Sequence, residues 1–172
     1  ALLGHAYAPV LRAVARQLTR GGLQTLLHPL EIEVAQRLCS VIPGAQAVRF
    51  GKNGSDATAL AARIARAVTG RDVILVSGYH GWHDWCAAGL ARRRGIPKIL
   101  QTLVKSFDLA APESLEAIFH SMPGRIAAVM ADVREEPAGR LNQVRDMAHR
   151  NGALFILDEI QSNFRYALGG AQ

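Results

Sequence analysis

An acidic pair ends an apolar run late in the sequence: residues 153–157 are all apolar, and Asp158 and Glu159 follow directly. Burying an unpaired carboxylate is costly, so we expect Asp158 to face a cation or a strong hydrogen-bond donor. The protonated ring nitrogen of a bound heterocycle would satisfy this acid, which would in turn keep that nitrogen protonated. The alternative is a structural aspartate paired with an arginine such as Arg165.

A second stretch with chemical potential is Asn53-Gly54-Ser55-Asp56, which precedes a long helical pattern. Glycine lets the backbone approach a ligand, Ser55 offers a hydroxyl, and the first amides of a helix are unpaired, so the stretch suits a phosphate group. The same residues also make an ordinary helix N-cap. Because no Gly-x-x-x-x-Gly-Lys-[Ser/Thr] sequence occurs, a Walker-type nucleotide site is excluded, and with it a Walker-B role for Asp158.

A third stretch, Gly78-Tyr79-His80-Gly81, follows the apolar run at residues 73–76. The face of Tyr79 suits stacking on a planar ring, although an aromatic residue beside a glycine also suits ordinary packing. His80, His83 and Asp84 have the composition of a metal cluster. No His-Glu-x-x-His pattern or partner motif accompanies them, so we expect no metal.

The elements that must position these residues alternate between helical and apolar patterns. Strands are predicted at residues 48–50, 73–76, 126–130 and 154–157. Helices are predicted from Pro9 to about Thr19, from Pro29 to Pro43, from Ala57 to Gly70, from Trp85 to Gly95, from near Pro112, and from about Leu141 to Asn151. This alternation predicts an α/β fold with three layers, α/β/α, around a mainly parallel sheet. Ligands in such sheets bind at the carboxyl ends of the strands, where the three stretches are expected to meet.

Composition narrows the class of protein. The chain has 172 residues, of which 49% are hydrophobic and 20% charged, and its formal net charge is +6. The arginines are dispersed apart from Arg92–Arg94, and no basic run is interleaved with aromatics, so we expect no nucleic-acid partner. No apolar run reaches the ~18 residues of a membrane span, so we expect no membrane partner.

Cys39 and Cys86 form no disulfide framework, which favours a reducing, cytoplasmic location. Since the sequence begins at Ala1 and stops at Gln172, we expect a piece of a longer protein.

The motifs together resemble the class III aminotransferases, most closely the glutamate-1-semialdehyde aminomutase-like branch of this pyridoxal-phosphate group. The resemblance begins near Gly4-His5 and covers nearly the whole chain. It is carried by residues 50–57 (FGKNGSDA), 65–72 (ARAVTGRD), 78–84 (GYHGWHD) and 158–161 (DEIQ), with Phe164-Arg165 and residues 168–172 (LGGAQ). These motifs keep the family's order.

The resemblance implies a fold type I transferase that uses pyridoxal 5'-phosphate and acts on a small amino or oxo substrate. It implies a homodimer when the protein is complete. Residues 1–172 would be a partial large domain, without the Schiff-base lysine region and the C-terminal small domain. By motif, Gly54 and Ser55 would bind the cofactor phosphate and Asp158 the protonated ring nitrogen. Tyr79 would stack on one ring face, Ile160 would pack on the other, and Gln161 would reach the ring hydroxyl.

Two departures from the family pattern stand out. The family's Glu-Pro after the strand at residues 126–130 is Asp132-Val133 here, and the loop toward Gly139-Arg140 is expected to be shortened. The only lysines are Lys52, Lys98 and Lys105, so none follows Asp158. Without that amine the cofactor has no covalent anchor and the substrate has no base, so we expect the isolated piece to be inactive.

Three functions therefore remain. The leading one is amino-group transfer, either to a second oxo-acid or aldehyde or back onto a neighbouring carbon of the same molecule. The alternative is a non-catalytic binding or regulatory protein that kept the phosphate loop and lost the lysine. A nicotinamide-dependent oxidoreductase is disfavoured because no Gly-x-Gly-x-x-Gly opens a helix after a strand.

Overall fold

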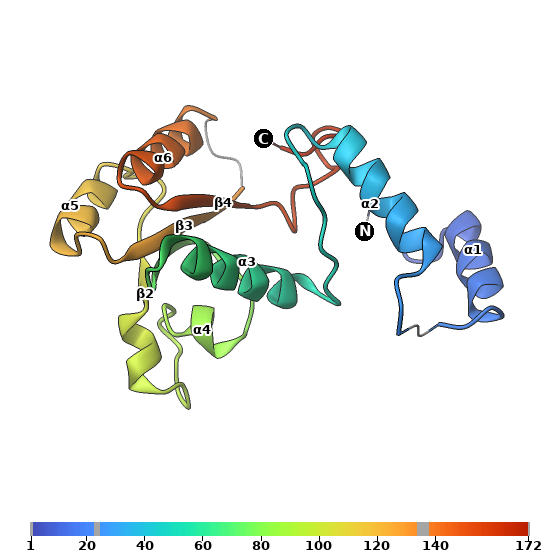
Figure 1. The fold of residues 1–172 in the computed structure, drawn as a ribbon, viewed down its shortest axis with the longest axis horizontal. Coiled ribbons are helices and arrows are strands. Elements are labelled where there is room, and N and C mark those ends of the chain that lie inside the picture. The colour runs from blue at the N-terminus through green and yellow to red at the C-terminus, as the bar shows by residue number, and fades with distance from the viewer. Residues whose placement is uncertain (1, 23–24, 134–137, 172) are drawn as a thin grey trace. The chain divides into compact units, whose positions relative to one another are not determined.

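A four-stranded parallel sheet forms the core of the computed structural model, which describes residues 2–22, 25–133 and 138–171 (Figure 1). Its strands are β1 (Val73–Ser77), β2 (Val104–Ser106), β3 (Ile126–Asp132) and β4 (Leu154–Asp158). They lie in the order β2-β1-β3-β4, and each neighbouring pair is parallel. The parallel α/β sheet predicted from the alternating pattern is confirmed.

Helices cover both faces of this sheet, which is why the central strands are apolar along their whole length. On one face, α5 (Ser114–Ser121) and α6 (Ala138–Arg150) pack against alternate residues such as Val73 and Leu75. On the other face, α3 (Gly54–Thr69) packs Ala62 and Ala65 against the intervening residues of the sheet. All seven residues of β3 are buried. The result is the predicted α/β/α arrangement, visible in Figure 1.

Helix α3 has clear start and stop signals. The Asn53 side chain caps its first turn by accepting a hydrogen bond from the Asp56 amide at 3.0 Å. Gly70 ends it with a φ of 65°, a conformation that glycine adopts without strain. Only Arg71 and Asp72 then separate the cap from β1, so α3 runs antiparallel to the strands. Its N-terminus therefore lies at the carboxyl edge of the sheet, although no strand precedes it among residues 2–22 and 25–53.

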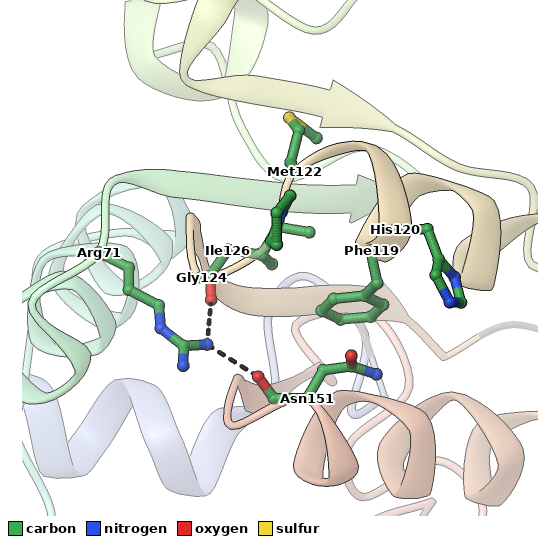
Figure 2. A pocket seen from close by; sticks show the side chains of 8 residues that line it. Arg71, Phe119, His120, Met122, Gly124, Ile126 and Asn151 are labelled. Atoms are coloured by element: carbon green, nitrogen blue, oxygen red, sulfur yellow. Dashed lines mark hydrogen bonds between the residues drawn. The ribbon is translucent and has the colours of Figure 1, made fainter.

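Arg71 links the segments at the starts of β3 and β4, at the opposite, amino edge of the sheet. Its guanidinium Nη1 donates to the carbonyl of Ile126 at 3.1 Å and to the carbonyl of Asn151 at 2.9 Å (Figure 2). These carbonyls lie at the start of β3 and just before β4. Arg71 also lines a pocket of about 240 Å³ with Phe119 and Met122. Since this pocket lies at the amino ends of the strands, it is not the candidate site.

Replacing Arg71 by Met is expected to lower the free energy of unfolding by about 2 kcal/mol, because two carbonyls lose a charged donor. Urea unfolding measures the change. Arg145→Met is the matched control, since Arg145 bonds to Asp146 and Asn142 on an exposed surface. The control should lose less than about 0.5 kcal/mol. Equal losses in the two variants would contradict the role of Arg71.

Residues Ala1–Arg49 with Asn163–Gln172 form one compact unit, and Phe50–Ser162, which contains the sheet, form another. The first unit contains α1 (Ala8–Leu18) and α2 (Pro29–Val41), and the latter begins with a capping box between His28 and Glu31. Neither helix contains a buried residue. No helix in the described part of the chain has both the length and the hydropathy needed to cross a membrane.

Two predicted elements were wrong, and one was missed. Residues 48–50 belong to no helix or strand and pair with no described strand. The helix predicted to run to Gly95 stops early, as α4 (Asp84–Ala87). Gly89, Gly95 and Pro97 interrupt the pattern, and a 3-10 helix, η1 (Lys98–Thr102), follows. Strand β2 was missed because three residues carry too little periodicity.

Candidate functional site

Asp158 is the last residue of β4 and is only 6% exposed. Its Oδ2 lies 2.8 Å from Nδ1 of His80, which is itself buried. Its Oδ1 accepts a hydrogen bond from the amide of Ile160 at 3.0 Å. The buried acid thus has a partner, as expected. That partner is His80, a residue for which the sequence suggested no such role.

Both nitrogens of the His80 ring take part in hydrogen bonds. Nε2 lies 3.0 Å from the carbonyl of Ser77, which can only accept, so Nε2 carries a hydrogen. The hydrogen bond between Nδ1 and the Asp158 carboxylate limits the cost of burying the two side chains. A carboxylate also has more acceptor positions than these two bonds use, so Asp158 can accept another donor.

The first residues of α3 contact two loops, the one that follows β4 and the one that follows β1. A Cβ added to Gly54 would lie 2.7 Å from Cδ1 of Ile160, two residues after Asp158. A Cβ added to Gly81 would meet the Ser55 hydroxyl and lie 3.2 Å from the Ser55 Cα. Gly81 also has a φ of 112°, which favours glycine. The three stretches singled out in the sequence therefore meet at the carboxyl edge of the sheet.

Two backbone amides at this edge have no acceptor within the part of the chain that the structure describes. Asn53 accepts from the amides of Ala57 (3.2 Å) and Asp56 (3.0 Å). Among residues 2–22, 25–133 and 138–171, no acceptor is found for the amides of Gly54 and Ser55. These N–H groups lie at the positive end of a 16-residue helix, beside the Ser55 side chain. The arrangement suits an anion such as a phosphate.

Two large side chains near the His80–Asp158 pair remain open to solvent. Tyr79 is 53% exposed and Ile160 is 57% exposed. Neither side chain is used in the hydrophobic core, so both can contact a ligand. Gln161 is exposed as well. The contacts of these three residues with a cofactor stay predictions.

His80, His83 and Asp84 are the residues whose composition resembles a metal cluster. The ring of His80 is engaged by Asp158 and Ser77. The residues that the structure describes contain no group of three or more His, Cys, Asp or Glu side chains placed to hold a metal. Cys39 and Cys86 are both free thiols.

Three further buried residues, to which sequence reasoning gave no part in the site, lie around the pair. Thr58 donates its hydroxyl to the carbonyl of His80 at 2.7 Å. The Cys86 thiol lies 3.3 Å from the Gly81 carbonyl, and burial raises the pKa of this thiol. Asp132, the residue noted as a departure from Glu-Pro, ends β3 directly opposite Asp158. Residues 134–137 of the loop expected to be shortened lie outside the described residues. A histidine just beyond a buried strand was the available signal for His80.

Comparison with known proteins gives one consistent result. A family model described as aminotransferase class-III matches residues 1–166. The chain is similar to 3-aminobutyryl-CoA aminotransferase of Cloacimonas acidaminovorans (strain Evry), with 34% identity covering 99% of this chain and 43% of that protein. It is also similar to glutamate-1-semialdehyde 2,1-aminomutase of Hyperthermus butylicus, with 35% identity covering 99% of this chain and 44% of that protein. The chain thus spans less than half the length of these relatives.

Solved structures give the same result for the fold. An omega-transaminase from Sphaerobacter thermophilus has a TM-score of 0.87 and 27% identity, covering 98% of this chain and 44% of that one. A glutamate-1-semialdehyde aminomutase from Pseudomonas aeruginosa PAO1 has a TM-score of 0.79 and 25% identity, covering 93% of this chain and 39% of that one. Another neighbour is described as a transaminase with PLP bound (TM-score 0.88, 25% identity, covering 98% and 43%).

Proposed function

This chain belongs to the class III aminotransferase family, and from that premise we propose that it supplies the cofactor-binding half of an enzyme for pyridoxal 5'-phosphate-dependent amino-group transfer. One observation carries the proposal. The free amides at the start of α3 and the buried Asp158 belong to one set of contacts, through Gly54 against Ile160 and Ser55 against Gly81. An anion site and a carboxylate at the same sheet edge match a ligand with a phosphate at one end and a basic ring nitrogen at the other.

The phosphate would be held at the N-terminus of α3. The amides of Gly54 and Ser55 and the Ser55 hydroxyl offer three donors, and the helix dipole favours the negative charge. The absence of side chains at Gly54 and Gly81 supports this assignment, because a Cβ at either position would fill space next to these donors.

The ring nitrogen would be held by Asp158. This carboxylate is buried and fixed by His80 and by the Ile160 amide, so it can orient a protonated nitrogen without rearranging. When bound, the cofactor ring withdraws electrons from the substrate carbon that loses its proton. The contribution of Asp158 is to keep the ring nitrogen charged. Tyr79 and Ile160 would cover the two ring faces and exclude water, while Gln161 would reach the ring hydroxyl.

We also propose that residues 1–172 are part of a larger fold type I domain, and that a lysine outside this sequence anchors the cofactor and moves the substrate proton. The substrate would be a small amino or oxo compound. Because the similar proteins include both an aminotransferase and an aminomutase, both outcomes of amino-group transfer stay open. We further propose a homodimer, which the family resemblance implies, and a cytoplasmic location, which the lack of a cysteine pattern for a disulfide framework favours.

Absorption spectroscopy of the full-length protein tests this function. Added pyridoxal 5'-phosphate should produce a visible band that changes when an amine donor is supplied. Equilibrium dialysis should show one cofactor bound per chain. Cofactor binding with no response to any amine would favour the alternative of a binding or regulatory protein. No binding at all, in a protein that contains the lysine, would contradict both.

A further inference from the structure

We propose that Thr58 is a positioning residue that fixes the Tyr79–Gly81 loop onto the first turns of α3. In this way a single hydroxyl sets the phosphate-binding amides and Asp158 at a fixed separation. The inference rests on the function proposed above, because it concerns the same cofactor. It assigns a task to a residue that touches neither the proposed phosphate nor the proposed ring.

The hydrogen bonds of Thr58 are the first support. Thr58 is 5% exposed, and its Oγ1 lies 2.7 Å from the His80 carbonyl and 3.2 Å from the Ser55 carbonyl. A hydroxyl has one proton to donate, so the shorter contact, to His80, is the principal bond. Among the described residues, the other donor found near the His80 carbonyl is the Cys86 thiol at 3.6 Å, a weak donor at long range. Thr58 therefore supplies the main bond to this buried carbonyl.

The spacing of the contacts is the second support. Thr58 lies three residues after Ser55, so the two side chains share one face of α3. Gly81 packs directly on Ser55, while the carbonyl of His80, the residue before it, is held by Thr58. Two consecutive loop residues thus rest on two successive positions of the same helix face. If the bond from Thr58 were lost, the peptide after His80 could move away from Ser55.

The third support is the connection from this peptide to Asp158. The backbone of His80 is held by Thr58, and its ring is held by Asp158 and by the Ser77 carbonyl. A shift of the His80 peptide would therefore change the orientation of the ring that fixes Asp158. One hydrogen bond consequently affects both ends of the cofactor site, and this distinguishes Thr58 from a residue that only stabilises α3.

The test compares Thr58→Val with Thr69→Val in the full-length protein. Both residues lie in α3, but the Thr69 hydroxyl donates within the helix, to the Ala65 carbonyl at 2.7 Å. We expect Thr58→Val to raise the apparent dissociation constant for pyridoxal 5'-phosphate about tenfold, through loss of one buried hydrogen bond. The affinity of Thr58→Val for pyridoxal, which lacks the phosphate, should fall as well. Thr69→Val should bind both compounds like the unmodified protein.

A second measurement needs no cofactor. Hydrogen exchange of the cofactor-free protein should be about tenfold faster in residues 79–83 of Thr58→Val, because the loop opens more easily. Exchange in the same residues of Thr69→Val should not change. Equal exchange rates in both variants, or equal affinity for pyridoxal 5'-phosphate, would overturn the role of Thr58.

A pair of smaller substitutions covers the case in which Thr58→Val does not fold. Thr58→Ser and Thr58→Ala both lose the methyl group, and only Thr58→Ala loses the hydroxyl. The serine variant should keep the cofactor affinity and the alanine variant should lose it. If Thr58→Ser and Thr58→Ala lost cofactor affinity to the same extent, the inference would be refuted. If the unmodified protein binds no pyridoxal 5'-phosphate, the proposed function fails first, whereas binding that is insensitive to Thr58 overturns the positioning role alone.

Discussion

Full-length protein carrying Asp158→Asn is expected to retain much of its affinity for pyridoxal 5'-phosphate and to lose about 10³-fold in kcat/KM. A neutral amide cannot hold a proton on the ring nitrogen, so the charge that stabilises the reacting carbon is lost. The proposed phosphate contacts at the start of α3 are left in place, so binding should be largely retained. Steady-state kinetics with an amine donor, together with equilibrium dialysis of the cofactor, separate the two effects.

Asp146→Asn provides the control for this substitution. Asp146 lies on the exposed surface of α6 and pairs there with Arg145, so the same chemical change should leave kcat/KM unaltered. Near-normal turnover in Asp158→Asn would show that Asp158 does not hold the ring nitrogen. Complete loss of cofactor binding would show instead that this residue mainly supports the architecture of the site.

A methyl group at Gly81 is expected to weaken pyridoxal 5'-phosphate binding about 30-fold, from about 2 kcal/mol of backbone and contact strain. The φ of 112° is unfavourable for alanine, and the new Cβ would press on the Ser55 side chain. Relief of this contact requires either the loop or the start of α3 to move, so the phosphate donors are displaced. A fluorescence titration of Gly81→Ala with the cofactor measures the change.

Gly95→Ala separates backbone strain from contact. Gly95 also has a positive φ, of 84°, but a Cβ there would meet no atom within 4 Å. This variant should lose some stability and keep its cofactor affinity. If Gly81→Ala and Gly95→Ala bound the cofactor equally well, the close approach of Gly81 to Ser55 would have no part in forming the site.

Elements with strong local patterns could be predicted from the sequence. The continuous apolar runs at β1, β3 and β4 are typical of strands buried on both faces, and each was found with small differences at its ends. Gly70 marked the C-terminal end of α3, whereas the predicted start at Ala57 came three residues late, because the helix is already capped by Asn53. Where the pattern was short, as in the three residues of β2, prediction failed because pairing with β1 is what makes that segment a strand.

The residues proposed to bind the cofactor were chosen individually, by motif, and the sequence also indicated that a buried Asp158 must have a partner. The tertiary structure decided which residue is the partner of Asp158. His80 and Asp158 are 78 positions apart; His80 follows β1 and Asp158 ends β4, and these two strands are separated by β3. They meet because the chain turns at Gly78, whose φ of 104° and close approach to Asp132 lead the loop across the end of β3. Strand order and loop path arise from packing of the whole sheet, so local sequence could indicate that Asp158 needed a partner but not that the partner was His80.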